Sequence, residues 1–156
     1  MKTLIVYATK YGATRQIGES IAAQMGGAAL YDVNSHAPIA IDEYDCIVLG
    51  SPLTAGMVRK EIKAFAEKNA DVLAGKRLGI FVSGLQADGG DEYLTKNFPA
   101  ALLDSARAKA FLGGVFDPAK CGWVARAVIK AVAKLEAYTS AIDEERIASF
   151  ARELRG

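Results

Sequence analysis

The residues best placed to do chemistry form a short loop, Thr9-Lys10-Tyr11-Gly12-Ala13-Thr14, between an apolar run and a helical pattern. Two hydroxyl side chains bracket a glycine, which lets the backbone turn its N–H groups toward a bound anion. The N-terminus of the following helix adds partial positive charge, so the loop can hold a terminal phosphate without an arginine. The alternative is a plain strand-to-helix turn in which Thr14 only caps the helix.

The other reactive residues of the chain form no known catalytic or metal-binding pattern. His36 is the only histidine and lies in a predicted surface loop, while Cys46 and Cys121 stand far apart without a CxxC or Cys/His spacing. The sequence therefore favours neither a metal site, a redox dithiol nor a Ser-His-Asp hydrolase. The chain has no GxGxxG after its first apolar run, which argues against a Rossmann dinucleotide site. It also has no Gly-Lys-Ser/Thr, which argues against a P-loop nucleotide site.

The elements that must position the loop are predicted from the apolar runs. Residues 3–8, 46–50, 78–82 and 110–113 are continuously apolar, which is typical of strands buried on both faces of a parallel sheet. Residues 28–33 predict a weaker edge strand. Strands alternate with helical patterns, so we predict one α/β domain over residues 1–156, a three-layer α/β/α sandwich with a five-stranded parallel sheet of order 2-1-3-4-5.

Four helical patterns separate and follow these strands. Apolar residues share one face at Ile17, Ile21 and Met25, closed by a Gly-Gly pair, and a second pattern joins Val58, Ile62 and Phe65. Residues 91–105 predict a helix that is broken near a proline, and residues 143–154 predict a terminal helix. In such a fold, ligands bind beyond the carboxyl ends of the strands, so the loops after the first and third strands matter most.

Three loops at these strand ends resemble the FMN-binding loops of flavodoxins. Residues 4–14 are similar to the family's phosphate signature, with Thr9, Gly12 and Thr14 in its fixed places. Residues 50–56 and 83–90 resemble the second and third flavin loops by their position. The resemblance implies a flavodoxin-like fold, FMN as the cofactor and no metal, with cofactor contacts from Thr9, Lys10, Tyr11, Gly12, Ala13, Thr14, Ser51, Pro52, Leu53, Thr54, Ala55, Gly56, Ser83, Gly84, Leu85 and Asp88.

The chain departs from ordinary flavodoxins in two ways. Those proteins often stack aromatic side chains from the second and third loops on the flavin, whereas the second loop here offers only Leu53 and Met57. Tyr93 either approaches from the third loop or packs on the core. Flavodoxins are also markedly acidic, while this chain has 19 Lys and Arg against 18 Asp and Glu. This balance gives no pull toward nucleic acid and is unlike a typical low-potential shuttle.

A segment near the C-terminus resembles another branch of the superfamily. Trp123, Arg126, Ile129 and Lys130 are similar to a helix of menaquinone-dependent protoporphyrinogen oxidases, in which electrons leave through FMN to a membrane quinone. Residues 120–135 also form a basic amphipathic pattern that can lie on anionic lipid. The alternative is a helix packed on the core with solvated lysines.

These observations leave three functions open. The first is an FMN-dependent redox enzyme of the protoporphyrinogen oxidase type, which passes electrons to a quinone. The second is a soluble FMN electron carrier between redox partner proteins, and the third is a cofactor-free interaction module, against which the intact first loop argues. No side chain stands out as a general acid or base, and flavin chemistry needs none.

The beginning of the chain bears on where the protein acts. The first residues run straight into a predicted strand and leave no room for a secretory signal peptide. No apolar run is long enough to span a bilayer. We therefore expect a cytoplasmic protein, with peripheral contact at the inner membrane face through residues 120–135 as the further expectation.

Overall fold

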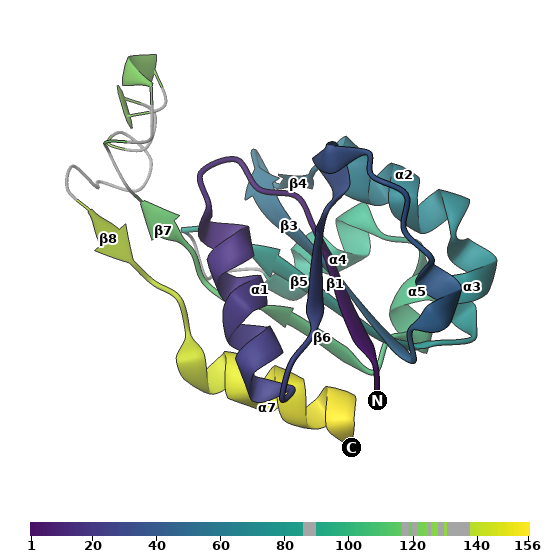
Figure 1. Cartoon of the computed structure of the whole chain (residues 1–156). Helices are drawn as coiled ribbons and strands as arrows, with labels where there is room; N and C mark the ends of the chain where they lie inside the picture. Colours follow the sequence, from purple (N-terminus) through teal and green to yellow (C-terminus); the bar gives the residue numbers. More distant parts are fainter. Residues whose placement is uncertain (86–89, 117–118, 120–121, 125, 128–129, 131–137) are drawn as a thin grey trace.

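A computed structural model describes residues 1–85, 90–116, 119, 122–124, 126–127, 130 and 138–156. Its centre is a parallel sheet in which the long strands follow the predicted order, β2-β1-β3-β5-β6 along the sheet. These strands are β1 (Thr3–Tyr7), β2 (Ala29–Asp32), β3 (Cys46–Thr54), β5 (Arg77–Ser83) and β6 (Ala108–Phe111). The prediction of a doubly wound α/β fold is therefore confirmed (Figure 1).

The central strands form because their side chains are apolar on both faces. Every residue of β1 is buried, as are the first six residues of β3 and the last six of β5. The edge strand β2 is exposed or half-buried throughout, in agreement with its weaker pattern. Burial on both faces requires a helical layer on each side of the sheet.

Helices supply these two layers (Figure 1). One face is covered by α1 (Ala13–Gln24) and α7 (Glu144–Arg155), whose buried Ile17, Ile21, Ile147 and Phe150 share a cluster with Phe81 of the sheet. The other face is covered by α2 (Lys60–Lys68), α3 (Ala70–Ala74), α4 (Gly90–Asn97) and α5 (Ala100–Ser105). Short 3-10 helices, Val33–Ser35 and Ile41–Glu43, connect β2 to β3. Two separate apolar clusters, one on each face, confirm the three layers.

Several element ends differ from the sequence prediction. The helix predicted over residues 91–105 is broken at Pro99, as expected. Pro99 has an extended backbone and immediately precedes α5. Val58, however, is not in α2. It lies in the two-residue strand β4 (Met57–Val58), which pairs antiparallel with the end of β3. Strand β3 continues beyond the predicted Gly50 to Thr54, because β4 gives its last residues a hydrogen-bonding partner.

The chain leaves the sheet after β6 and returns through a second ribbon. Strands β7 (Val115–Phe116) and β8 (Thr139–Ser140) pair antiparallel, with Phe116 opposite Thr139. Of the predicted basic helix between them, Ile129 and most of residues 128–135 lie outside the described residues, and so does Cys121.

The described residues of that segment are accessible to solvent. Trp123 and Val124 are 76% and 55% exposed, and Arg126 and Lys130 are also exposed. Val124 belongs to the predicted amphipathic helix of residues 120–135, and the alternative that this helix packs on the core is wrong at Val124. Among the helices that the structure describes, none combines the length and the hydropathy that a bilayer crossing requires.

Candidate functional site

The three predicted loops lie at one edge of the sheet because the strands that precede them are parallel neighbours. Tyr7 at the end of β1 pairs with Gly50 of β3, and Pro52 of β3 pairs with Ser83 at the end of β5. The backbone N–H of Ala8 also donates to the carbonyl oxygen of Gly50 at 3.0 Å. The register therefore brings residues 9–14, 51–56 and 83–85 to the same end of the sheet.

The first loop is shaped around Gly12. Its φ of 93° is left-handed, which favours glycine, and its N–H donates to Oγ1 of Thr9 at 2.9 Å. The first hydrogen bond into α1 runs from Gln16 N–H to the Gly12 carbonyl, at 3.0 Å. The N–H groups of Ala13, Thr14 and Arg15 precede this bond, so they have no acceptor within the helix. This arrangement suits a phosphate.

Thr14 does not cap the helix. It is the second residue of α1, and its Oγ1 lies 2.8 Å from Oγ of Ser83 at the start of the third loop. Both residues are only 1% exposed, so water does not replace either partner. The hydroxyl pair therefore joins the first loop to the third, and the capping alternative for Thr14 is wrong.

The charged side chains near the first loop are engaged at its surface. The amine of Lys10 lies 5.2 Å from the ring centre of Tyr11. The guanidinium of Arg15 forms an ion pair with Glu19 at 3.1 Å, and this hydrogen bond raises the pKa of Arg15. Lys10 is therefore the cation within residues 9–14, and the rest of the cradle consists of backbone and hydroxyl groups.

The second loop is a tight hairpin between β3 and β4. Thr54 pairs with Met57, and the two turn residues Ala55 and Gly56 both have left-handed φ, at 52° and 76°. Two successive left-handed residues are the mark of a type I′ turn, which matches the twist of the strands. Leu53 is half-buried and Met57 is 40% exposed, so the hairpin offers apolar surface beside the loops.

Ser51 secures the base of this hairpin. The residue is fully buried, and its Oγ accepts a hydrogen bond from the N–H of Arg59 at 2.8 Å and donates to the Pro52 carbonyl at 2.9 Å. Both hydrogen bonds of the Ser51 hydroxyl are made to backbone groups of the protein itself. Its hydroxyl therefore holds the start of α2 against the end of β3, a role that the loop resemblance does not reveal.

The third loop is described through Leu85, and the predicted contact Asp88 lies outside the described residues. The N–H of Gly84 donates to the Gly113 carbonyl at 2.9 Å, which ties this loop to the end of β6. A Cβ added at Gly84 would lie 3.9 Å from Cβ of Leu53, so the second and third loops are neighbours. The structure thus brings the described part of all three loops together.

Two residues of α4 contact the second loop, and only one of them was named from the sequence alone. The ring of Tyr93 lies against the hairpin turn, where a Cβ added at Gly56 would be 3.2 Å from its Cε1. Asn97 is 7% exposed and hydrogen-bonds to both Gly56 and Val58. No motif marks Asn97, although a buried amide at the last position of a helix is a general signal for a structural hydrogen bond.

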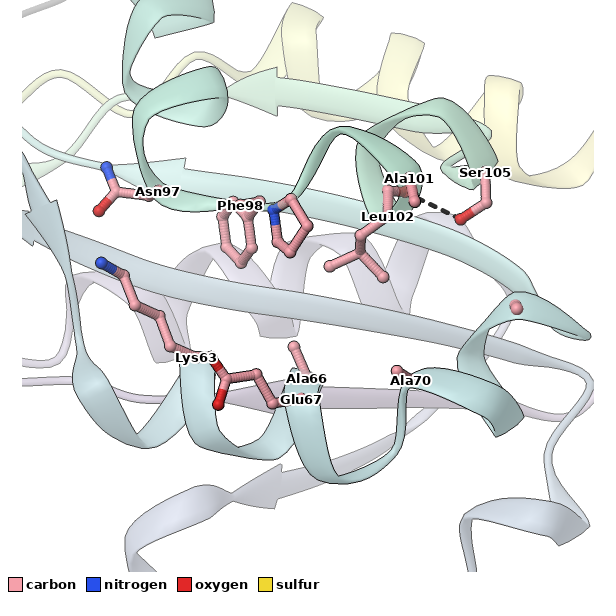
Figure 2. A pocket seen from close by; sticks show the side chains of 11 residues that line it. Lys63, Ala66, Glu67, Ala70, Asn97, Phe98, Ala101, Leu102 and Ser105 are labelled. Carbon is pink, nitrogen blue, oxygen red and sulfur yellow. Dashed lines mark hydrogen bonds between the residues drawn. The ribbon is translucent and has the colours of Figure 1, made fainter.

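A separate cavity of about 340 Å³ lies between the helices of one layer. In Figure 2, Phe98, Ala101 and Leu102 face Ala66 and Ala70 across it, with Asn97 at one end and Ser105 at the other. None of the predicted cofactor-binding residues lines this cavity. The backbone arrangement that suits a phosphate therefore lies in the first of the three loops and not at this cavity.

The residues of the three loops fit the group that the resemblance implies. The left-handed Gly12 and the N–H groups at the start of α1 suit a phosphate. The apolar side chains of Leu53 and Met57 suit a planar aromatic ring.

Comparison with known proteins supports this fold. A family model described as a flavodoxin domain matches residues 4–143. Flavodoxin 2 of Bacillus cereus superposes with a TM-score of 0.64 at 21% identity, covering 99% of this chain and 98% of that one. An FMN-bound flavodoxin variant of Fusobacterium nucleatum superposes with a TM-score of 0.52 at 18% identity, covering 99% and 96%. Curated protein sequences contain no significant match.

Proposed function

This chain belongs to the flavodoxin domain family, and on that premise we propose that it is an FMN-binding electron carrier between redox partners. FMN is the cofactor of the three-loop site. The observation that carries this proposal is the first loop, in which Gly12 turns the backbone and the first N–H groups of α1 have no acceptor within the helix. FMN, when bound, supplies the capacity to accept and release electrons one or two at a time.

The residues of the chain then have separate tasks. Thr9, Gly12 and the N–H groups at the start of α1 hold the phosphate, and the Thr14–Ser83 hydroxyl pair keeps that loop aligned with the third one. The hairpin around Ala55 and the start of the third loop frame the ring. By their position, Pro52 and Thr54 belong to the second loop and Leu85 to the third, the two loops that frame the ring. Lys10, Tyr11 and Ala13 belong to the loop that holds the phosphate.

The near-neutral charge of the chain bears on how it docks with redox partners. The chain carries a formal net charge of +1, so no strong overall field steers a highly charged protein toward it. Met57, 40% exposed at the hairpin, offers apolar surface beside the ring frame. We therefore expect partner docking to depend weakly on ionic strength, in contrast to steered association between oppositely charged proteins.

Titration of the apoprotein with FMN tests the proposal. Binding should quench flavin fluorescence, shift the visible spectrum and raise the unfolding midpoint in proportion to ligand concentration. Riboflavin, which lacks the phosphate, is the matched control and should bind much more weakly because the first loop recognises the phosphate. Absence of binding by FMN would remove the basis of the proposal.

A second function rests on the exposed segment after β7. Trp123 and Val124 are exposed beside the basic Arg126 and Lys130, a combination that suits an anionic membrane surface. Contact with a membrane supports the second function, a protoporphyrinogen oxidase-like enzyme that passes electrons to a quinone. The FMN-loaded protein, given protoporphyrinogen and a menaquinone analogue without oxygen, should turn over if this function holds. Absence of turnover would contradict this second function and leave the electron-carrier function as the one proposed.

Flotation with vesicles is an independent test of the membrane contact. Retention on phosphatidylserine vesicles that falls with added salt and with Trp123→Ala supports contact through this segment. Equal flotation with neutral and anionic vesicles would contradict it.

A further inference from the structure

Asn97 is buried at a junction between the second loop and the helix that follows the third loop. It is the last residue of α4 and is only 7% exposed. In Figure 2 its side chain stands at one end of the interhelical cavity, beyond Phe98. The three loops that form the proposed cofactor site do not include it, so its role has to be inferred from its contacts.

Those contacts use both ends of the side-chain amide. Oδ1 accepts a hydrogen bond from the N–H of Val58 at 3.0 Å. Nδ2 donates to the Gly56 carbonyl at 2.9 Å and to the Tyr93 carbonyl at 2.8 Å. Because two carbonyls face Nδ2 and one N–H faces Oδ1, the orientation of the amide is fixed by its surroundings.

The second loop needs such an anchor because its own pairing is short. Strand β4 has two residues, and a hairpin with so few pairs is marginal by itself. Ser51 holds the base of the hairpin through Arg59, and Asn97 holds the turn and the returning strand. The ring of Tyr93 packs on the turn from the same helix.

We infer that Asn97 is a positioning residue for the cofactor, one that fixes the conformation of the Ala55–Gly56 turn and so sets FMN affinity and reduction potential. This inference rests on the proposed function. It does not require contact between Asn97 and the cofactor. A turn that is free to move would have to be ordered when the cofactor binds, which reduces affinity, and its backbone dipoles would no longer be held at one place around the ring.

The test compares Asn97→Ala with Asn69→Ala. Asn69 follows α2, and its Nδ2 donates to the carbonyl of Phe65, four residues earlier, at 2.9 Å. The Asn69 amide thus makes the same kind of bond to its own helix as the Asn97 amide makes to the Tyr93 carbonyl, and among the described residues no hydrogen bond joins its side chain to the hairpin. Asn69→Ala should leave FMN affinity within about twofold of wild type, whereas Asn97→Ala should weaken it about tenfold, equivalent to ~1.4 kcal/mol.

Four measurements separate positioning from simple loss of stability. Hydrogen exchange of the Val58 amide in the apoprotein should accelerate in Asn97→Ala and not in Asn69→Ala. Fluorescence titration gives the affinity for FMN, and equilibration with redox dyes gives the reduction potential, which should shift only in Asn97→Ala. The unfolding midpoints of both variants show how much stability each one has lost.

Asn97→Asp keeps the test decisive if Asn97→Ala does not fold. The aspartate preserves the acceptor for Val58 N–H but loses the donor to Gly56, and a protonated carboxyl restores a donor. Burial beside the Gly56 and Tyr93 carbonyl oxygens raises the pKa of this carboxyl above the ordinary aspartate value, so the variant's affinity deficit relative to wild type should narrow as the pH falls from about 7 to about 5. Wild-type affinity and potential in both Asn97 variants would overturn the inference, whereas failure of wild type to bind FMN would overturn the proposed function itself.

Discussion

Removal of the Ser83 hydroxyl should destabilise the protein by leaving Thr14 without a partner. The two oxygens are 2.8 Å apart, and each residue is 1% exposed. An unpaired buried hydroxyl costs about 1–3 kcal/mol, so Ser83→Ala and Thr14→Val should each lose about that much free energy of unfolding. The double variant leaves no orphaned hydroxyl, and its loss should be only about 0.5–1.5 kcal/mol.

A double-mutant cycle on the apoprotein measures this coupling. Urea unfolding should give a coupling free energy of at least ~0.5 kcal/mol between the two positions, and each 1 kcal/mol should move the thermal midpoint by about 2–4 °C. Ser149→Ala is the matched control. Its Oγ accepts a surface hydrogen bond from Arg152 at 2.9 Å, and its removal should change stability by no more than about 0.5 kcal/mol.

The cycle also tells whether the first and third loops are joined in solution. Losses for Ser83→Ala and Thr14→Val that add to within about 0.3 kcal/mol in the double variant would refute the pairing. In that case the hydroxyls act separately, and the alignment of the phosphate loop with the third loop would need another cause.

Three further predictions concern the loops and the core. Gly12→Val should weaken FMN binding about tenfold or more in fluorescence titrations, because the φ of Gly12 is left-handed and disfavours a branched side chain. Lys10→Ala should change FMN affinity less than about threefold. A larger effect of Lys10→Ala than of Gly12→Val would mean that charge dominates phosphate binding. Ala55→Asn should raise the unfolding midpoint by relieving a left-handed alanine, with a gain of about 0.5–1 kcal/mol, and a lower midpoint would contradict the type I′ turn. Burial raises the pKa of the Cys46 thiol above its ordinary value of 9.0, so the unfolded chain releases that proton first. Stability should therefore fall as the pH rises past 9.0, and Cys46→Val should lack that component in unfolding measured against pH.

The sheet could be predicted from the sequence because its strands are buried on both faces. A continuous apolar run such as that of β1 is too short for a buried helix and has the length of a central strand. Right-handed crossovers through the intervening helices then restrict the strand order. Gly12 was similarly accessible to prediction, since a glycine between a strand and a helix carries a local backbone requirement. Local rules therefore accounted for the frame and for the phosphate loop.

The remaining features depend on residues that are far apart in the chain. Thr14 and Ser83 are separated by 69 positions, so a local motif predicts a helix cap where the structure has a buried hydroxyl pair. Val58 matched a helical spacing with Ile62, although the hairpin places it in β4. The turn itself was missed because Ala55-Gly56 is not the Asn-Gly or Asp-Gly pair that indicates a type I′ hairpin.

The ribbon of β7 and β8 has an evolutionary consequence. Val115 pairs with Ser140 and Phe116 with Thr139, so the chain leaves the ribbon at Phe116 and returns to it at Thr139, two neighbouring points of the fold. A stretch whose ends already meet can be shortened, exchanged or lengthened at little entropic cost to the body that carries it. Insertions, deletions and substitutions between these two strands can therefore accumulate in evolution while the sheet and its three loops stay unchanged.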